Sequence, residues 1–191
     1  MTMDWNHVLT EQLTFHWEHA LRPRLDGMTD DEYFWEPVAD CWSIRPADDQ
    51  RPQIGSGPFR MECGRNEAGE LYFDAVEGPA PVATAAWRLG HITTGVLGQR
   101  TQNHFAGPSC DARTWAYAGS AQDALDQLDA AYDGWVSGVR ALGEEGLTEP
   151  CGPTEGPYAE YPMADLVTHI HREVIHHGAE VCLLRDLYAH R

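Results

Sequence analysis

Apolar residues recur every three or four positions along four long stretches of this chain, which is the spacing of helices with one buried face. The first stretch runs from about Asp4 to Leu25 and the second from Thr84 to Phe105. The third runs from Ser120 to Leu142, with Gly143 and Gly146 as its stop, and the fourth from Asp165 to Tyr188. Four helices of roughly 20 residues and no strong strand pattern predict an all-α four-helix bundle.

Residues 36–83, between the first two long helices, form an irregular insertion with many proline and glycine residues. Phe59–Cys63 and Glu70–Asp74 are predicted to form a small hairpin there. Just before it, Thr29 is the predicted N-cap of a short helix, with Glu32 in the capping-box position. A connection this long is unusual in a compact domain unless it is functional, so we expect it to cover one end of the fold and to shape a pocket.

The formal net charge is −17, from 30 acidic residues and 13 basic residues, all of which are arginine. The lack of lysine excludes Schiff-base chemistry, and the lack of a basic patch argues against nucleic acid and anionic membranes as partners. No apolar run approaches the ~20 residues of a membrane span, and the N-terminus does not look like a signal peptide. We therefore expect one cytoplasmic domain covering residues 1–191.

The fourth helix carries two polar residues on a stripe that is otherwise apolar. Glu173 and His177 are four residues apart, so they point the same way, and burying them is costly unless something pairs with them. A metal ion is one such partner, and His91 on the second helix is the best third ligand. Two imidazoles and one carboxylate suit zinc, nickel or iron(II), and three protein ligands leave a coordination position open for catalysis.

Simpler explanations of the same residues stay open. A histidine on a mixed helix face is commonly just hydrogen-bonded, and Glu173 would be satisfied by an arginine such as Arg172, Arg88 or Arg24. Cysteine offers no alternative site, because five scattered cysteines without a CxxC pair argue against both disulfides and thiolate zinc binding.

Other pairs on the last helix have metal-ligand spacing as well. His176 and Glu180 are four residues apart, and His169 precedes Glu173 by four. Periodicity places His169, His176 and Glu180 on a polar, solvated face, and it places His171 on the far side of the helix, as a surface group or a group supporting the ligands. There is no HExxH motif, nucleophile elbow or phosphate loop.

Three segments carry a resemblance to a known family: Leu25–Tyr33, Trp87–His91 and Arg172–Glu180. The chain resembles the DinB-like metalloprotein superfamily along essentially its whole length. It is most similar to the branch that contains mycothiol-dependent maleylpyruvate isomerase and related small-thiol transferases. The resemblance implies a four-helix bundle and His91, Glu173 and His177 as ligands, most often to zinc, with mycothiol as a cosubstrate. The His-His-Gly-Ala-Glu ending and the lack of a second domain differ from that isomerase.

The leading functional hypothesis is a metal-dependent enzyme that activates a small, mycothiol-like thiol for transfer to, or isomerisation of, a small electrophile. One alternative is a hydrolase that uses a metal-bound hydroxide. Another is a stress protein that binds a metal or small molecule without turnover. The catalytic residues are unassigned; His16 and His176 are candidate general bases. The expected partners are a small-molecule substrate and a small thiol, and a homodimer is an open alternative.

Overall fold

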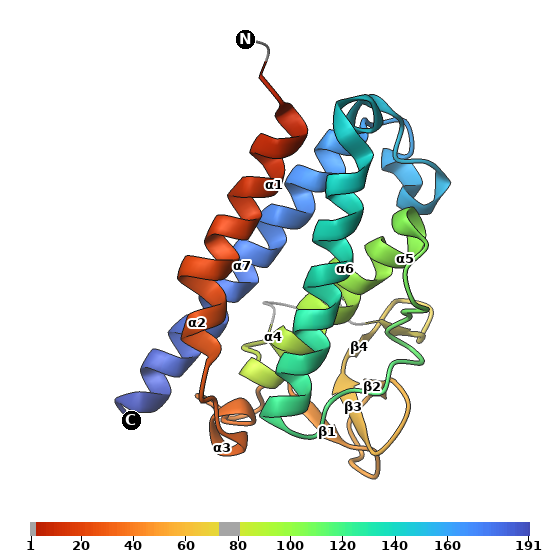
Figure 1. Cartoon of the computed structure of the whole chain (residues 1–191). Helices are drawn as coiled ribbons and strands as arrows, with labels where there is room; N and C mark the ends of the chain where they lie inside the picture. The colour runs from red at the N-terminus through yellow and green to blue at the C-terminus, as the bar shows by residue number, and fades with distance from the viewer. Residues whose placement is uncertain (1–2, 73–80) are drawn as a thin grey trace.

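The computed structural model describes residues 3–72 and 81–191, and this part of the chain is mainly helical, as predicted. Four long helical segments run side by side along the length of the molecule (Figure 1). The first segment comprises α1 (Trp5–His16), η1 (Trp17–Leu21) and α2 (Arg22–Leu25), and the second comprises α4 (Ala85–His91), η2 (Ile92–Gly98) and α5 (Gln99–Phe105). The third is α6 (Ala121–Thr148) and the fourth is α7 (Met163–Ala189).

Side-chain caps begin the first three helices where the sequence pattern places them. Asp4 accepts a hydrogen bond from the His7 amide, and Thr84 and Ser120 likewise accept from the amide three residues on. These bonds satisfy backbone donors that have no partner inside the helix. The fourth helix begins directly after Pro162, whose fixed φ suits a helix entry. The predicted starts of the four periodic stretches are therefore close to the observed helix starts.

Two of the helical segments contain π-helical turns, η1 and η2. The first ends just before Pro23, which lies in the first turn of α2, where a missing amide hydrogen is tolerated. The second begins at Ile92, directly after His91. Such wide turns are rare and occur often at functional sites.

The third helix is interrupted at Gly143, as predicted, but Gly146 does not stop the helical turns that follow. Gly143 has φ 62° and ψ −176°, so the helix kinks there, but helical turns resume and continue to Thr148. A residue without a Cβ adopts this positive φ at little cost, which lets the chain bend without ending the helix.

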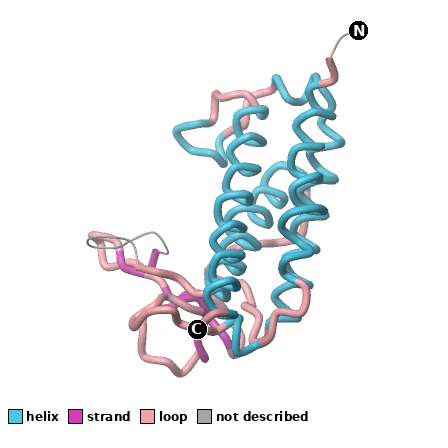
Figure 2. The backbone as a smooth tube through the Cα atoms, turned by 90° about the vertical axis from the view of Figure 1, so that its left-hand side faces the viewer, coloured by secondary structure: helices cyan, strands magenta, loops and turns pink. Residues whose placement is uncertain are grey.

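A short helix, α3 (Asp30–Tyr33), precedes the insertion, and the insertion contains two small antiparallel sheets at one end of the long helices (Figure 2). The first sheet has the order β1 (Ile44–Pro46), β3 (Phe59–Glu62), β2 (Gln53–Ile54), and the second pairs β4 (Gly64–Arg65) with β5 (Leu71–Tyr72).

The turn of the predicted hairpin, expected at residues 67–69, and its second arm are in place, but its first arm is wrong. The residues that pair with β5 belong to β4, whereas β3 lies between β1 and β2. Apolar alternation identified β3 as a strand but could not identify its neighbours. The predicted end of the second arm, at Asp74, lies outside the described residues.

Thr29 caps α3 as predicted, by accepting a hydrogen bond from the Glu32 amide. The Glu32 side chain does not complete a capping box. Its carboxylate forms two hydrogen bonds with the Arg185 guanidinium, at 2.6 and 3.2 Å. This pair connects α3, just before the insertion, to the last turns of α7.

The core contains residues from all four long segments, such as Leu13, Leu97, Trp135 and Ile170, each at most 1% exposed. The predicted apolar stripe of α7 faces this core, and Leu166, Ile170 and Val181 are buried. Among the described residues, no helix combines the length and apolarity that crossing a bilayer requires.

His171 is buried, not on the surface. Its ring is 6% exposed and meets the Trp135 indole edge-to-face, with 6.3 Å between ring centroids. Helical periodicity placed it away from the Glu173 stripe, but a second helix, α6, covers that side as well. Burial lowers the pKa of His171 to about 4, because a charged imidazole loses its hydration there.

This burial predicts acid sensitivity of the fold. The pKa of His171 is near 6.5 in the unfolded chain and about 4 in the folded one. Above pH 6.5 the imidazole is neutral in both states and does not affect stability. As the pH falls from 6.5 toward 4, the unfolded chain binds the proton first, so the free energy of unfolding decreases. The expected loss of unfolding free energy between pH 7 and pH 5 is about 2 kcal/mol. Urea titrations at both pH values should show this loss in the wild type, and His171→Leu should reduce it by that amount. An equal pH dependence in both proteins would contradict the prediction.

Candidate metal centre

His177 lies between two carboxylates of its own helix. Its Nε2 is 3.4 Å from Glu173 Oε2, and its Nδ1 is 2.7 Å from Glu180 Oε2. The imidazole is 12% exposed, whereas the two carboxylate side chains are 28% and 33% exposed. The second distance is that of a strong hydrogen bond, and the first is not.

Glu180 determines which nitrogen of His177 carries a proton. Burial raises the pKa of Glu180, but the hydrogen bond with His177 and the charge of Arg88 outweigh it, so the pKa is lowered and the carboxylate is ionised. An ionised carboxylate only accepts, so Nδ1–H donates to it. In the neutral imidazole, Nε2 then presents a lone pair toward Glu173.

Two acceptors therefore face each other across 3.4 Å, unless a proton or a cation lies between them. A proton on Nε2 would make His177 an imidazolium held by two glutamates. A metal ion fits the same gap, since two donor atoms bound at ~2.0–2.1 Å to a tetrahedral ion are about 3.3 Å apart. The pair thus has the geometry of two ligands of one ion.

His91, on the second segment, contacts the His177 ring. Its ring meets the His177 ring edge-to-face at 4.9 Å between centroids, with an interplanar angle of 88°. Burial, together with the nearby His177, Arg88 and Arg100, lowers the pKa of His91 to about 3. It is therefore neutral at physiological pH, which is the form of imidazole that binds metals.

Trp87 positions His91 from one turn earlier on α4. The two rings are stacked, with centroids 5.3 Å apart and planes 15° apart. The Trp87 indole is held in turn by its Nε1–H, which donates to the Glu62 backbone carbonyl at 2.9 Å. The insertion thus contributes to the centre indirectly, by fixing the aromatic ring on which His91 rests.

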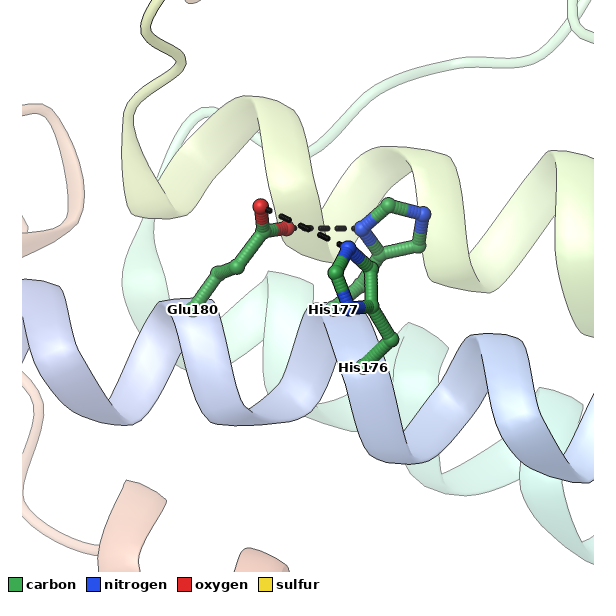
Figure 3. Close-up of side chains that lie close together, drawn as sticks. All are labelled: His176, His177 and Glu180. Carbon is green, nitrogen blue, oxygen red and sulfur yellow. Dashed lines mark hydrogen bonds and ion pairs between the residues drawn. The ribbon is translucent and has the colours of Figure 1, made fainter.

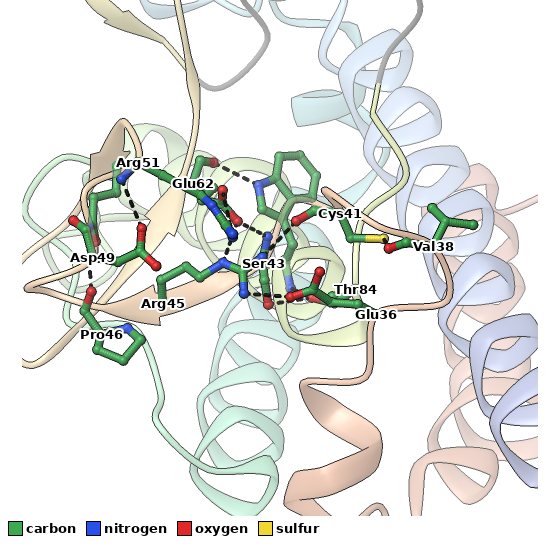
Figure 4. Close-up of polar contacts among 12 residues, drawn as sticks. Glu36, Val38, Cys41, Ser43, Arg45, Pro46, Asp49, Arg51, Glu62 and Thr84 are labelled. Carbon is green, nitrogen blue, oxygen red and sulfur yellow. Dashed lines mark hydrogen bonds and ion pairs between the residues drawn. The ribbon is translucent and has the colours of Figure 1, made fainter.

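The Glu62 carboxylate is the centre of a buried polar network that ties the insertion to α4 (Figure 4). Its Oε2 accepts from the Ser43 amide and from Arg45 Nε, both at 2.8 Å, and Arg51 lies 3.6 Å from Oε1. Ser43 also shares a hydroxyl hydrogen bond of 2.9 Å with Thr84, the N-cap of α4. This network fixes where α4 begins, about two turns before His91.

A second group of possible ligands shares His177. The His176, His177 and Glu180 side chains point from α7 toward the second helical segment, and one ligand atom from each lies within 4.8 Å of the others (Figure 3). However, the 2.7 Å contact of His177 with Glu180 is shorter than the separation of two tetrahedral ligands. We therefore assign Glu180 the role of orienting His177 rather than of binding metal.

The prediction that Glu180 lies on a solvated face is wrong. Arg88 on α4 pairs with it, with 3.0 Å from Nε to Oε2, and covers that side of α7. The spacing of three residues from His177 signalled the hydrogen bond, but the arginine partner depends on how α4 and α7 pack. His176 is exposed as predicted, at 64% of its side chain.

The arginine explanation of Glu173 receives limited support. Arg172 Nε is 3.9 Å from Glu173 Oε1, but its side chain is 67% exposed, so the pair is weak. The two other candidates have different partners: Arg88 pairs with Glu180, and Arg24 pairs with Asp186. His169 Nδ1 lies 3.6 Å from Glu173 Oε1. The expected triad of His91, Glu173 and His177 stays a prediction.

The fold is mainly helical, and a cluster of histidines and carboxylates lies between two of its long helices. The chain belongs to the DinB superfamily, whose family model matches residues 12–181. Members of this superfamily typically bind metal ions. Searches of the curated proteins and of the solved structures gave no significant match.

Proposed function

We propose that the protein is a metal-dependent enzyme and that His91, Glu173 and His177 hold its divalent cation, zinc in the first place and nickel or iron(II) otherwise. The observation that carries this proposal is the 3.4 Å gap between His177 Nε2 and the Glu173 carboxylate, together with neutral His91 in contact with the His177 ring. Family membership supports it independently.

The cation would supply Lewis acidity, since a thiol or water at its open position loses its proton near neutral pH. The chain's own residues provide the remaining functions. Glu180 and Arg88 hold His177 in the tautomer that a ligand needs. His176 is exposed beside His177, with 4.9 Å between ring centroids, and is placed to accept the proton that an incoming thiol releases.

A small thiol is the proposed nucleophile and a small electrophile the proposed substrate. Support comes from Glu173, because a carboxylate at the first position of the last-helix pair is the feature that the chain shares with the mycothiol-dependent branch. Isomerisation through a reversible adduct and conjugation both begin with the same attack, so one assay tests both.

The test is conjugation of a chlorobimane to mycothiol, bacillithiol and glutathione by the zinc-loaded protein, followed by fluorescence. We expect turnover with at least one thiol and none above background with His91→Ala, which removes a proposed ligand. Lack of turnover with all three thiols, together with cleavage of ester or amide substrates, would replace the thiol proposal by hydrolysis. Lack of both activities, with thermal shifts on ligand addition, would identify a binding protein.

A further inference from the structure

A cavity of about 350 Å³ lies between the second helical segment, α6 and the connection that joins them, residues 106–120. In Figure 1 this connection runs from the end of α5 back along the molecule to the start of α6. The candidate metal centre lies instead where the second segment meets α7, and none of the residues assigned to it lines the cavity. The cavity has the volume of a small-molecule site and is separate from the metal centre.

The cavity exists because small residues line it on both helices. Gly98 is on the second segment, and Ala130, Ala131 and Gly134 are on α6, so two helical faces with little side-chain volume meet there. The Trp115 side chain, from the connection, forms part of the remaining wall. The wall is therefore mainly apolar and includes one large aromatic ring, which suits an apolar, ring-shaped ligand.

Most polar side chains on this wall already have partners. Trp115 Nε1 donates to Gln127 Oε1 at 3.1 Å, and the Gln127 amide nitrogen donates to the Ala116 carbonyl at 3.0 Å. The Thr101 hydroxyl donates to the Leu97 carbonyl at 2.8 Å. These groups offer a ligand little hydrogen bonding, and the bonds of Gln127 hold the Trp115 ring in place.

Thr93 is the exception on this wall. It is 2% exposed and lines the cavity, but its hydroxyl makes no hydrogen bond with any residue that the structure describes. Its neighbour Thr94 and its wall partner Thr101 both donate to the carbonyl four residues earlier, each at 2.8 Å. Native structures rarely leave a buried hydroxyl without a partner unless a water or ligand supplies one.

The charges on the wall indicate a neutral ligand. Among the described residues that line the cavity none is basic, whereas Asp126 is acidic, so an anion would lack a counter-charge. Burial raises the pKa of the Cys110 thiol to about 11, so this wall residue is also uncharged at neutral pH.

We propose that this cavity binds a small, neutral aromatic alcohol or phenol. The ligand hydroxyl pairs with Thr93, and the ring occupies the apolar space between Trp115 and the small residues of α6. Apolar burial supplies most of the affinity, and the single hydrogen bond selects a ligand that carries a hydroxyl. This binding needs no metal ion, so it stands apart from the proposed enzymatic function.

The test is titration of the protein with para-fluorophenol, para-fluorotoluene and para-fluorobenzoate, followed by fluorine NMR at neutral pH. The first two compounds are neutral there and differ in the hydroxyl, and the third carries a charge. We expect saturable binding of the phenol, about three- to tenfold tighter than that of the toluene, which is the range for one hydrogen bond. The benzoate should bind more weakly than either.

Three variants assign this binding to the cavity. Thr93→Val keeps the shape of the side chain and should reduce phenol binding to the level of the toluene. Thr94→Val is the matched control: Thr94 is also 2% exposed, but its hydroxyl is bonded to the Gly90 carbonyl and it does not line the cavity, so the preference for the phenol should persist. Ala131→Leu fills the cavity and should weaken both neutral compounds about tenfold. Circular dichroism confirms that each variant is folded.

Four outcomes would overturn the inference. The first is no saturable binding of the phenol, and the second is a preference for the phenol that persists in Thr93→Val. The third is unchanged binding in folded Ala131→Leu, which would place the phenol elsewhere on the protein. The fourth is benzoate binding as tight as phenol binding, which would indicate a cationic site rather than this apolar one.

Discussion

His177→Ala is expected to reduce bound metal from about one ion per chain to less than a tenth of that, because it removes one of three protein ligands. Only Glu173 and His91 then remain, and two protein ligands are too few to retain a divalent ion against a chelator. His91→Ala should have an effect of similar size. Metal content is measured by elemental analysis after purification and dialysis, with circular dichroism to confirm that the variants are folded.

Two neighbouring residues provide graded controls for this result. His176→Ala should retain wild-type metal content, because His176 belongs only to the rival group with Glu180. Glu180→Ala should keep the ion but weaken its binding about 10–100-fold in a chelator competition, as expected for a residue that orients a ligand. Full metal content in His177→Ala would contradict both ligand groups. Loss of metal in His176→Ala, with retention in His91→Ala, would favour the rival group.

Glu62→Ala is expected to lower the free energy of unfolding by about 3–5 kcal/mol, the cost of removing one partner from a buried ion pair. The carboxylate is 6% exposed and accepts hydrogen bonds from Arg45 Nε and the Ser43 amide, each at 2.8 Å. Both donors would lose this acceptor in the variant. Arg45 would retain its contact with Glu36, which sets the lower end of that range. Urea denaturation followed by tryptophan fluorescence measures the change.

Glu70→Ala is the matched control for Glu62→Ala. Glu70 lies in the same insertion, but it is exposed, and within the described part of the chain its carboxylate pairs with Asn66, so its loss should cost less than ~0.5 kcal/mol. Similar costs for the two substitutions would show that the Glu62 network contributes no more than a surface contact. The Glu62 variant should also bind metal more weakly, since Trp87 would lose part of the frame that holds His91.

Much of the fold could be predicted because helical information is local. An apolar spacing of three to four residues identified the four long segments, and Thr84 and Ser120 marked helix starts through their own side chains. The same spacing identified Glu173 and His177 as the two polar residues on the inward stripe of α7. A helix keeps residues four apart on one face whatever surrounds it, so that pair did not depend on tertiary structure.

Contacts between segments distant in the sequence could not be predicted in this way. The pairing of β3 with β1 and β2, the burial of His171 against α6 and the Arg88–Glu180 ion pair each depend on how separate elements pack. Residue spacing determined which side chains of α7 share a face. Only the tertiary structure decided which of them meet His91, because a side chain's neighbours on another helix depend on packing that no local pattern encodes.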